Sequence, residues 1–366
     1  MSVERTAALA APPMPRRAPA SWRRILWLAL AALVACYLPV VLNDRAIFGI
    51  RLSNMQLLNI SLTQVNLMLI TLLGALSLNY LTGVAGLVSI GHAAFYALGA
   101  MTGAVVGTQL GLPFPVALVA SALVGAVAGV VAGLPSLRVR GLYFVLSTFA
   151  LHYIVVFALS EYQFRVFDVV GIPFEDAALG PWTLDTPLRW YFFLLVLCVL
   201  VYAGLRNSLR SREGRALMAT RDHELAASAA GIDVRIIRLK VFGLSSAIAA
   251  VAGTLYSYYM TNVNAEFFSI NFAIQFVAII IIGGMGSLAG SLVGSAVWLL
   301  LPAVITGLAT NAGSVDSVVG AFLTEAKPQL VNLIFGALVI VLLIFAPEGI
   351  AGIGRNLKSR LVRRVP

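Results

Sequence analysis

The chain has 366 residues, of which 60% are hydrophobic and only 11% are charged. Soluble domains carry about 25% charged residues, so this composition excludes a soluble globular protein and predicts an all-α, polytopic membrane protein. The net charge of +10 does not imply a nucleic-acid partner, because Lys and Arg also collect on the cytoplasmic side of membrane proteins. We therefore expect membrane lipid, and no nucleic acid, around the chain.

A transmembrane helix needs about 20 apolar residues, and the sequence offers about ten candidate spans. They cover residues 25–42, 57–81, 86–107, 114–134, 142–160, 188–205, 240–260, 270–285, 288–308 and 328–346. Residues 1–24 are rich in Ala, Pro and Arg and are expected to form a disordered tail. The spans 86–107 and 270–285 are interrupted by glycine at one end, so they can be short or re-entrant.

The distribution of charge predicts the orientation. With a cytoplasmic N-terminus, 20 of the 25 Lys and Arg residues fall in cytoplasmic segments and nine of the 15 acidic residues fall outside. This asymmetry is the positive-inside pattern, so both termini are expected in the cytoplasm. The membrane domain, 25–350, then has a cytoplasmic loop at 206–240, an outer loop at 161–188 and a basic cytoplasmic tail at 351–366.

Ionisable groups are missing from the candidate spans, apart from Arg189 and Lys240 at span ends. Proton-coupled carriers and membrane enzymes need such groups at depth, so both classes are disfavoured. His92 and His152 are the remaining candidates, and a single membrane histidine usually packs through a hydrogen bond. The two cysteines lie in apolar runs without metal-ligand spacing, so no metal and no cofactor is predicted.

Uncharged polar residues within the spans are candidates for lining a solute pathway. They are Asn66, Asn79, His92, Ser147 and Thr148, with Gln64, Ser89, Asn271 and Gln275 as further candidates. The same residues can instead be hydrogen-bond partners between helices, and the sequence leaves both interpretations open.

A faint internal repeat suggests two related halves. Gly83-Val-Ala-Gly86 recurs as Gly283-Gly-Met-Gly286. Each is followed by glycines spaced four apart, which place small residues on one helix face for close packing. These glycines are Gly99, Gly103 and Gly107 in the first half and Gly286, Gly290 and Gly294 in the second.

The longest polar stretch lies at 206–240. We predict a helix through Glu224–Ala230, capped by Thr220 or Asp222 and ended by Gly231. Its face is mostly alanine, which anchors poorly in lipid but fits a protein groove. Docking into a partner protein is therefore favoured over resting on lipid headgroups.

Four passages together carry a family resemblance. They are Gly214-Arg-Ala-Leu…Arg221-Asp-His-Glu-Leu-Ala-Ala…Gly231-Ile, Leu78-Asn-Tyr-Leu-Thr-Gly83…Gly86-Leu-Val-Ser-Ile-Gly91-His-Ala-Ala-Phe, Leu137-Arg-Val-Arg-Gly141-Leu-Tyr-Phe and Ala346-Pro-Glu-Gly349-Ile. The chain resembles the branched-chain amino acid permease family of ABC importers, and within it the LivM-type subunit. The general importer motif places the acidic residue directly before two alanines, whereas Leu225 intervenes here.

The resemblance implies a set of partners and a site. Two separate ABC ATPase subunits would dock on Arg221, Asp222, Glu224, Ala226, Ala227 and Gly231. A second homologous permease subunit and a periplasmic binding protein would complete the importer, in a bacterial inner membrane. The chain itself contains no Gly-x4-Gly-Lys-Ser/Thr motif, so it is not expected to hydrolyse ATP by that route.

The solute stays open at this stage. Branched-chain or related amino acids fit the resemblance, and urea, short amides or aromatic acids fit the same architecture. A carrier that works alone is the competing class, and it is disfavoured by the absence of charge within the spans.

Overall fold

The computed structural model describes residues 61–139, 141–168, 171–174 and 177–313, with short pieces between 333 and 352. All of these belong to one compact unit, Asn54–Pro366. The expected N-terminal tail, the span 25–42 and the C-terminal tail from residue 353 lie outside the described residues. Of the expected span 328–346, residues 333–334, 336–341 and 344 are described, and all of them are helical.

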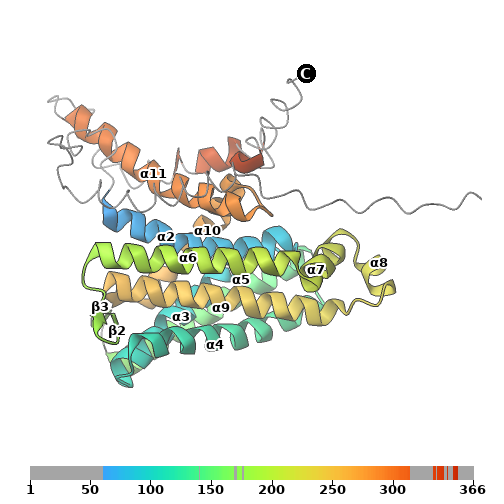
Figure 1. Ribbon diagram of the computed structural model, residues 1–366, viewed down its shortest axis with the longest axis horizontal. Helices are drawn as coiled ribbons and strands as arrows, with labels where there is room; N and C mark the ends of the chain where they lie inside the picture. The colour runs from blue at the N-terminus through green and yellow to red at the C-terminus, as the bar shows by residue number, and fades with distance from the viewer. Residues whose placement is uncertain are drawn as a thin grey trace, which may run out of the picture. The chain divides into compact units, whose positions relative to one another are not determined.

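The described chain is almost entirely helical, which confirms the all-α prediction (Figure 1). The α-helices are α2 (Leu62–Leu78), α3 (His92–Ala104), α4 (Phe114–Gly133), α5 (Leu142–Phe167), α6 (Pro187–Arg210), α7 (Arg212–Asp222), α8 (Glu224–Ala229), α9 (Val234–Met260), α10 (Ile270–Gly283) and α11 (Leu288–Gly313). Short π- and 3-10 segments are η3 (Asn79–Val84), η4 (Val105–Gln109), η5 (Leu134–Leu137) and η6 (Ala265–Phe268). Two small antiparallel pairs join β1 (Ile172–Pro173) to β4 (Asn262–Val263) and β2 (Ala178–Leu179) to β3 (Trp182–Thr183).

Five helices among the described residues are long and apolar enough to cross a membrane. They are Leu62–Val84, Phe114–Leu137, Leu142–Phe167, Pro187–Arg210 and Val234–Met260. A sixth span arises if α10 and α11, which are bent by 118° at a short break, count as one. The chain is thus a polytopic membrane protein, and the count of ten spans is not confirmed.

The two spans that glycine interrupts are the ones that depart from full length. α3, with 13 residues, continues directly into the five residues of η4, and α10 has 14 residues. Neither segment reaches the roughly 20 that a span requires. Before α3, residues 85–91 are non-helical, so the chain enters that helix partly unwound. Behind α10, the chain turns sharply into α11 instead of continuing to a new loop.

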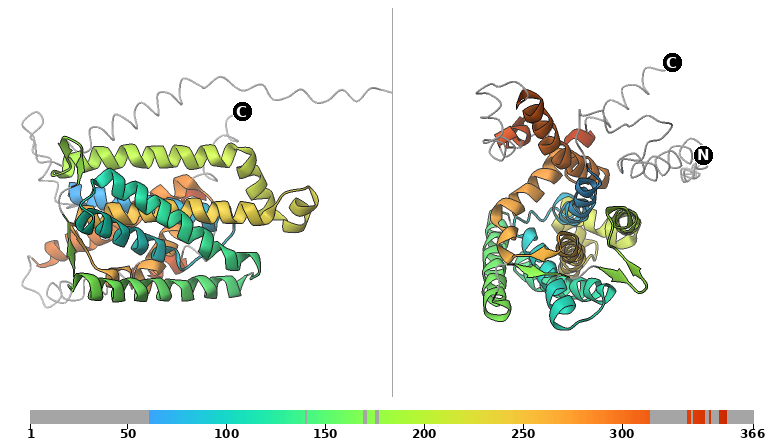
Figure 2. Two further views of the ribbon diagram at one scale, coloured as in Figure 1. Left: turned by 90° about the horizontal axis from the view of Figure 1, so that it is seen from below. Right: turned by 90° about the vertical axis from the view of Figure 1, so that its left-hand side faces the viewer.

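The core is built on α9, which packs against α2, α3 and α4 (Figure 2). Its buried face consists mostly of small residues, including Ser246, Ala249 and Ala250. On α3, a Cβ at Gly99 would collide with the Ala250 carbonyl oxygen. On α4, a Cβ at Gly129 would lie 2.5 Å from the Ser246 side chain. Backbones therefore approach at van der Waals distance, as is usual where lipid offers no hydrophobic drive for association.

The predicted glycine sets lie in different surroundings. Gly103 and Gly107 face Thr254 and Tyr258 of α9, continuing the contact made by Gly99. The second set is not one helix face: Gly286 lies in the turn before α11 with a φ of +80°, and Gly290 and Gly294 pack against the end of α10. The reason is the break at 284–287, which removes Gly286 from the helix that carries the other two.

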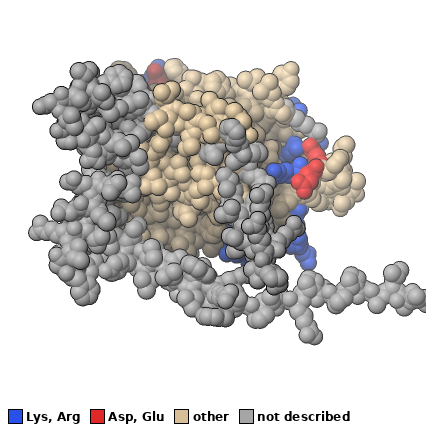
Figure 3. All heavy atoms as spheres, turned by 90° about the horizontal axis from the view of Figure 1, so that it is seen from above, with Lys and Arg blue, Asp and Glu red and all other residues tan. Residues whose placement is uncertain are grey.

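The polar segments separate to two ends of the bundle. The coupling end, as we call it, holds the end of η3, η5, α7, α8 and the 284–287 turn. It is held together by hydrogen bonds from Arg221 to the Gly83 carbonyl and from Arg238 to the Ser136 carbonyl. The opposite end holds the four strands (Figure 1). In Figure 3 charged side chains gather at the coupling end, beside a broad uncharged surface. The described loops that the charge distribution predicts to be cytoplasmic therefore lie together at one end of the bundle.

Close packing on α9 predicts the effect of single methyl groups. Gly99→Ala should lower the free energy of unfolding by about 1–3 kcal/mol, because the added Cβ meets the Ala250 backbone. Gly204→Ala in α6 is the matched control, since no described atom lies within 4 Å of the added Cβ, and it should change stability by less than about 0.5 kcal/mol. Thermal unfolding in detergent measures both. Equal melting temperatures for the two variants would contradict this account of the core.

Candidate functional site

The loop 206–240, the coupling loop, contains two helices where one was expected. α7 begins after Ser211, whose Oγ accepts the Gly214 N–H at 3.2 Å. The predicted caps do not cap α8: Thr220 donates its hydroxyl to the Leu217 carbonyl at 2.7 Å, and Asp222 is the last residue of α7. Both lie within the first helix, and the N-cap position of the second is His223, where no side chain makes a capping hydrogen bond.

The end of α8 is a Schellman motif built on Gly231. The Gly231 N–H donates to the Ser228 carbonyl at 3.0 Å, and the Ile232 N–H donates to the Ala227 carbonyl at 3.1 Å. Gly231 has a φ of +82°, a conformation that favours glycine. The glycine stop inferred from the sequence is therefore present.

α8 turns one side to the protein and the rest to solvent. Ala227 is buried, while Leu225 is 77% exposed. Ala226 and the residues from Ser228 to Gly231 are exposed as well. The helix thus presents a smooth surface of small residues with one large apolar side chain projecting from it.

Ion pairs hold the coupling loop on the bundle. Glu224 pairs with Arg238 of α9 at 2.9 Å, and Arg238 also donates to the Ser136 carbonyl at 3.1 Å. Lys240 pairs with Glu213 of α7 at 2.5 Å. The Glu224 pair is largely shielded, with 25% and 15% of the two side chains exposed, so this carboxylate serves the loop itself.

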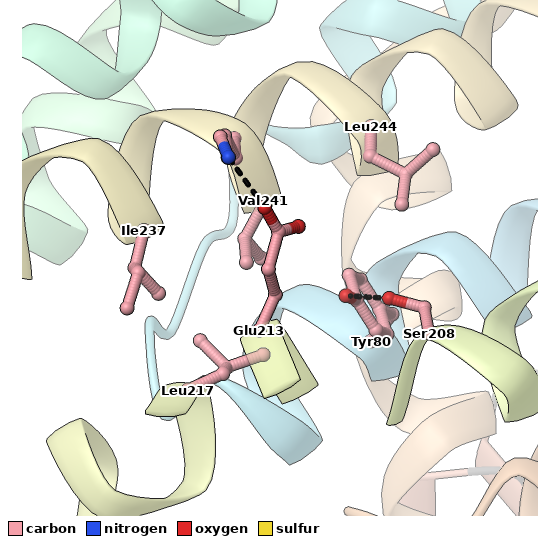
Figure 4. A pocket seen from close by; sticks show the side chains of 8 residues that line it. Tyr80, Ser208, Glu213, Leu217, Ile237, Val241 and Leu244 are labelled. Carbon is pink, nitrogen blue, oxygen red and sulfur yellow. Dashed lines mark hydrogen bonds and ion pairs between the residues drawn. The ribbon is translucent and has the colours of Figure 1, made fainter. Parts of the chain in front are cut away.

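A small cavity lies beneath α7, between it and α9 (Figure 4). The Tyr80 and Ser208 hydroxyls hydrogen-bond at 2.9 Å on one side of it, and the Glu213–Lys240 pair lies at its rim. Its volume is about 50 Å³, whereas ligand pockets occupy about 300–1,000 Å³. The cavity can hold water but not an amino acid.

Arg221 is exposed, but its guanidinium group reaches the bundle. Its Nη1 donates to the Gly83 carbonyl at 2.7 Å, at the end of η3. Of the six residues expected to contact ATPases, four are exposed and Ala227 is buried. The exposed ones are Arg221, Asp222, Ala226 and Gly231. Arg221 and Glu224 also bond to neighbouring elements.

The pathway candidates are engaged between helices and lie far apart. Asn66 donates to the Pro187 carbonyl at 2.8 Å, near the opposite end. Asn79 contacts the 284–287 turn at the coupling end. The two are separated by 13 residues of helix, about 20 Å at 1.5 Å per residue. They do not belong to one binding site.

Three further candidates, His92, Thr148 and Gln64, make local packing contacts. The Ser77 hydroxyl donates to the Gly74 carbonyl and lies 2.8 Å from His92 Nε2, so Nε2 carries the proton that Ser77 accepts. Thr148 accepts the Ile90 N–H at 3.3 Å, which docks the unwound segment before α3. Ser147 beside it is partly exposed. Gln64 completes a capping box with Ser61 at the start of α2.

The comparisons with known proteins identify the family. Residues 60–343 match the family described as "Branched-chain amino acid transport system / permease component". The chain belongs to this family.

Three relatives are named LivM. The chain is 29% identical over 308 residues to the high-affinity branched-chain amino acid transport system permease protein LivM of Escherichia coli K12, covering 78% of this chain and 68% of that one. It is 28% identical to the LivM protein of Salmonella typhimurium, with 75% and 66% covered. It is also 28% identical to a probable LivM of Methanocaldococcus jannaschii, with 44% and 46% covered. The chain spans about two thirds of the length of the first two. No solved structure matches.

Sequence reasoning missed the contacts that hold the coupling loop. Glu213, Arg238 and Lys240 were counted only as charges that indicate sidedness. Their partners lie 14 or 27 residues away or across helices, beyond the helical spacing of three or four. The sequence feature that indicates such ion pairs is the presence of both acidic and basic residues in one short loop.

The Schellman motif predicts how α8 responds to substitution. Gly231→Ala should raise the rate of amide hydrogen exchange in residues 224–232, because a Cβ disfavours the left-handed backbone by about 1 kcal/mol. Gly231→Asn should exchange more like the wild type, since asparagine tolerates this conformation. Exchange followed by mass spectrometry on purified protein measures both. Indistinguishable exchange in all three proteins would contradict the motif.

Proposed function

We propose that the chain is the transmembrane permease subunit of an ABC importer that translocates branched-chain or related amino acids. The observation that carries this proposal is the family match over residues 60–343, joined with an exposed two-helix loop. The named relatives are permeases for branched-chain amino acids. This favours amino acids over urea, short amides or aromatic acids as the solute.

The proposed importer contains further subunits. Two ATPases dock on α8, a second homologous permease pairs with this chain, and a periplasmic binding protein delivers the solute to the opposite end. ATP then shifts the population between inward- and outward-facing states, to the extent that its binding favours one of them. ATP hydrolysis resides in the partner subunits.

The surface of α8 supports ATPase docking. Small exposed residues allow close approach of a partner groove, and Leu225, 77% exposed, supplies an apolar anchor of the kind that dominates interfaces. The shielded ion pair of Glu224 with Arg238 stiffens the loop that carries it, and the exposed Lys240–Glu213 pair adds little. A rigid loop transmits displacement, whereas a loose one absorbs it.

Docking predicts a strong effect at Leu225. In a complex expressed with two ATPase subunits, Leu225→Asp should reduce ATPase co-purification and solute uptake about tenfold or more, since a charge would enter an apolar contact. Leu225→Met conserves volume and should keep both near wild type. Pull-down and uptake of labelled leucine into proteoliposomes measure the effect. Full assembly and uptake in Leu225→Asp would exclude α8 as the docking element.

The proposed orientation can be tested by labelling. Ser228 of α8 and Trp182 of β3 are both exposed, at opposite ends of the bundle. In a background with Cys36 and Cys198 replaced by alanine, a membrane-impermeant maleimide should label Trp182→Cys on intact spheroplasts. Ser228→Cys should react only after permeabilisation. The reverse pattern would invert the orientation and place α8 away from ATP.

A further inference from the structure

The turn between α10 and α11 is formed by close-packed backbone with two glycines at positive φ. Gly284 and Gly286 have φ values of +115° and +80°, and the two helices meet at 118°. A turn inside a membrane bundle exposes backbone N–H and C=O groups that need partners within the protein. The question is which residues supply them.

Asn79 supplies hydrogen bonds to two backbone groups of the turn and a third to the Ser291 hydroxyl in α11. Its Oδ1 accepts the Gly286 N–H at 2.8 Å, and its Nδ2 donates to the Ser287 carbonyl and to Ser291 Oγ, both at 2.8 Å. The side chain is completely buried. A backbone N–H can only donate and a carbonyl can only accept, so the orientation of the amide is fixed.

Backbone contact adds to these hydrogen bonds. A Cβ at Gly83 would collide with the Gly286 nitrogen, so the end of η3 lies directly on the turn. From another side, a Cβ at Gly349 would lie 2.5 Å from Gly284 Cα. The turn is therefore clamped between segments that are far apart in sequence, and it cannot move independently of η3.

Arg221 attaches the coupling loop to the same place. Its Nη1 donates to the Gly83 carbonyl at 2.7 Å and lies 3.6 Å from the Cβ position of Gly286. A Cβ added at Gly86 would lie 3.1 Å from Arg221 Cγ. The arginine side chain therefore packs against glycines, and a larger residue at these positions would push it away. Arg221 stands in the last turn of α7, three residues before Glu224 begins α8.

We propose that Arg221 and Asn79 form a mechanical connection from the coupling loop, through η3, to the break between α10 and α11. Arg221 is then a positioning residue that transmits displacement, and it does not contact the ATPase. η3 suits this role, because π-helical segments are rare and occur mostly at functional sites. The inference rests on the proposed function and assigns a role to residues that the docking surface does not use.

A shift of α8 would pass to Gly83 through one charge-assisted hydrogen bond and to the turn through the Asn79 amide. The turn would then change the angle between α10 and α11, a hinge motion about positive-φ glycines. A purely structural role predicts instead that the same residues matter for stability alone. The two roles are distinguished by whether nucleotide binding still alters the structure of the turn after Arg221 is replaced.

The experiment compares coupling with assembly. In the complex with two ATPase subunits, Arg221→Ala should leave ATPase co-purification and basal ATP hydrolysis unchanged, while solute uptake per ATP hydrolysed falls about tenfold. Arg221→Lys should recover part of the uptake, since an ammonium group can still donate to the Gly83 carbonyl. Arg212→Ala, an exposed arginine on the same helix, is the matched control and should behave as the wild type.

Asn79→Asp tests the second contact at constant volume. It removes both donors and turns a carboxylate toward the Ser287 carbonyl, so uptake per ATP should fall as in Arg221→Ala. The double variant Arg221→Ala/Asn79→Asp should lose no more than the worse single variant, because both break one connection. Additive losses would show two independent effects and would overturn the proposal.

The turn itself gives a direct readout. Met285 is 47% exposed, and maleimide labelling of Met285→Cys should change rate when ATP and vanadate trap the complex. Arg221→Ala should abolish this change while trapping proceeds. Loss of ATPase binding in Arg221→Ala would make Arg221 a docking residue and overturn the proposal. The proposal would also be overturned if Arg221→Ala left the response of Met285→Cys unchanged, or if Arg221→Ala, Arg221→Lys and Asn79→Asp all failed to fold. Failure of the wild-type complex to assemble or transport would instead reject the proposed function, and the connection with it.

Discussion

Close contact between backbones along α9 is the constraint on which the rest of the structure depends. In lipid the helices gain little from burying apolar surface against each other, so association relies on packing and hydrogen bonds. Small residues on α9 meet glycines on α3 and α4, and Thr254 reaches the Gly99 carbonyl at 2.8 Å. This arrangement fixes three helices as one rigid body. α5, in which few residues are buried, lies outside this tight group.

Three segments of irregular backbone lie around this close-packed centre. α3 begins after an unwound segment, η3 departs from α-helical geometry, and α10 and α11 meet at a break. All three irregularities lie toward the coupling end, where Gly83, Gly286 and Arg221 meet. Displacement applied to the coupling loop would therefore reach these irregular segments through Arg221, as well as α9 through the ion pairs of Glu224 and Glu213.

Sequence reasoning succeeded where physical rules act locally. Hydropathy predicted the membrane class, charge grouped the polar segments correctly, and glycine marked α3, α10 and the end of α8. It failed for long-range contacts: Asn79 bonds to residues more than 200 positions away, and Arg221 donates to the Gly83 carbonyl of η3. No periodicity encodes such pairs. The alanine-rich string predicted the location of the exposed helix but not its start, because α8 begins after His223 without a side-chain cap.

The length of α10 ties this protein to the thickness of its bilayer. Fourteen residues of helix extend about 21 Å, while the hydrocarbon layer is about 30 Å thick. A bilayer responds to a short helix by thinning locally, at a cost of fractions of a kcal/mol for each Å. The amide of Asn79 suits such a depth, since it offers donors and an acceptor without charge. Acyl-chain length in the surrounding lipid would therefore bear directly on the angle at which α10 meets α11.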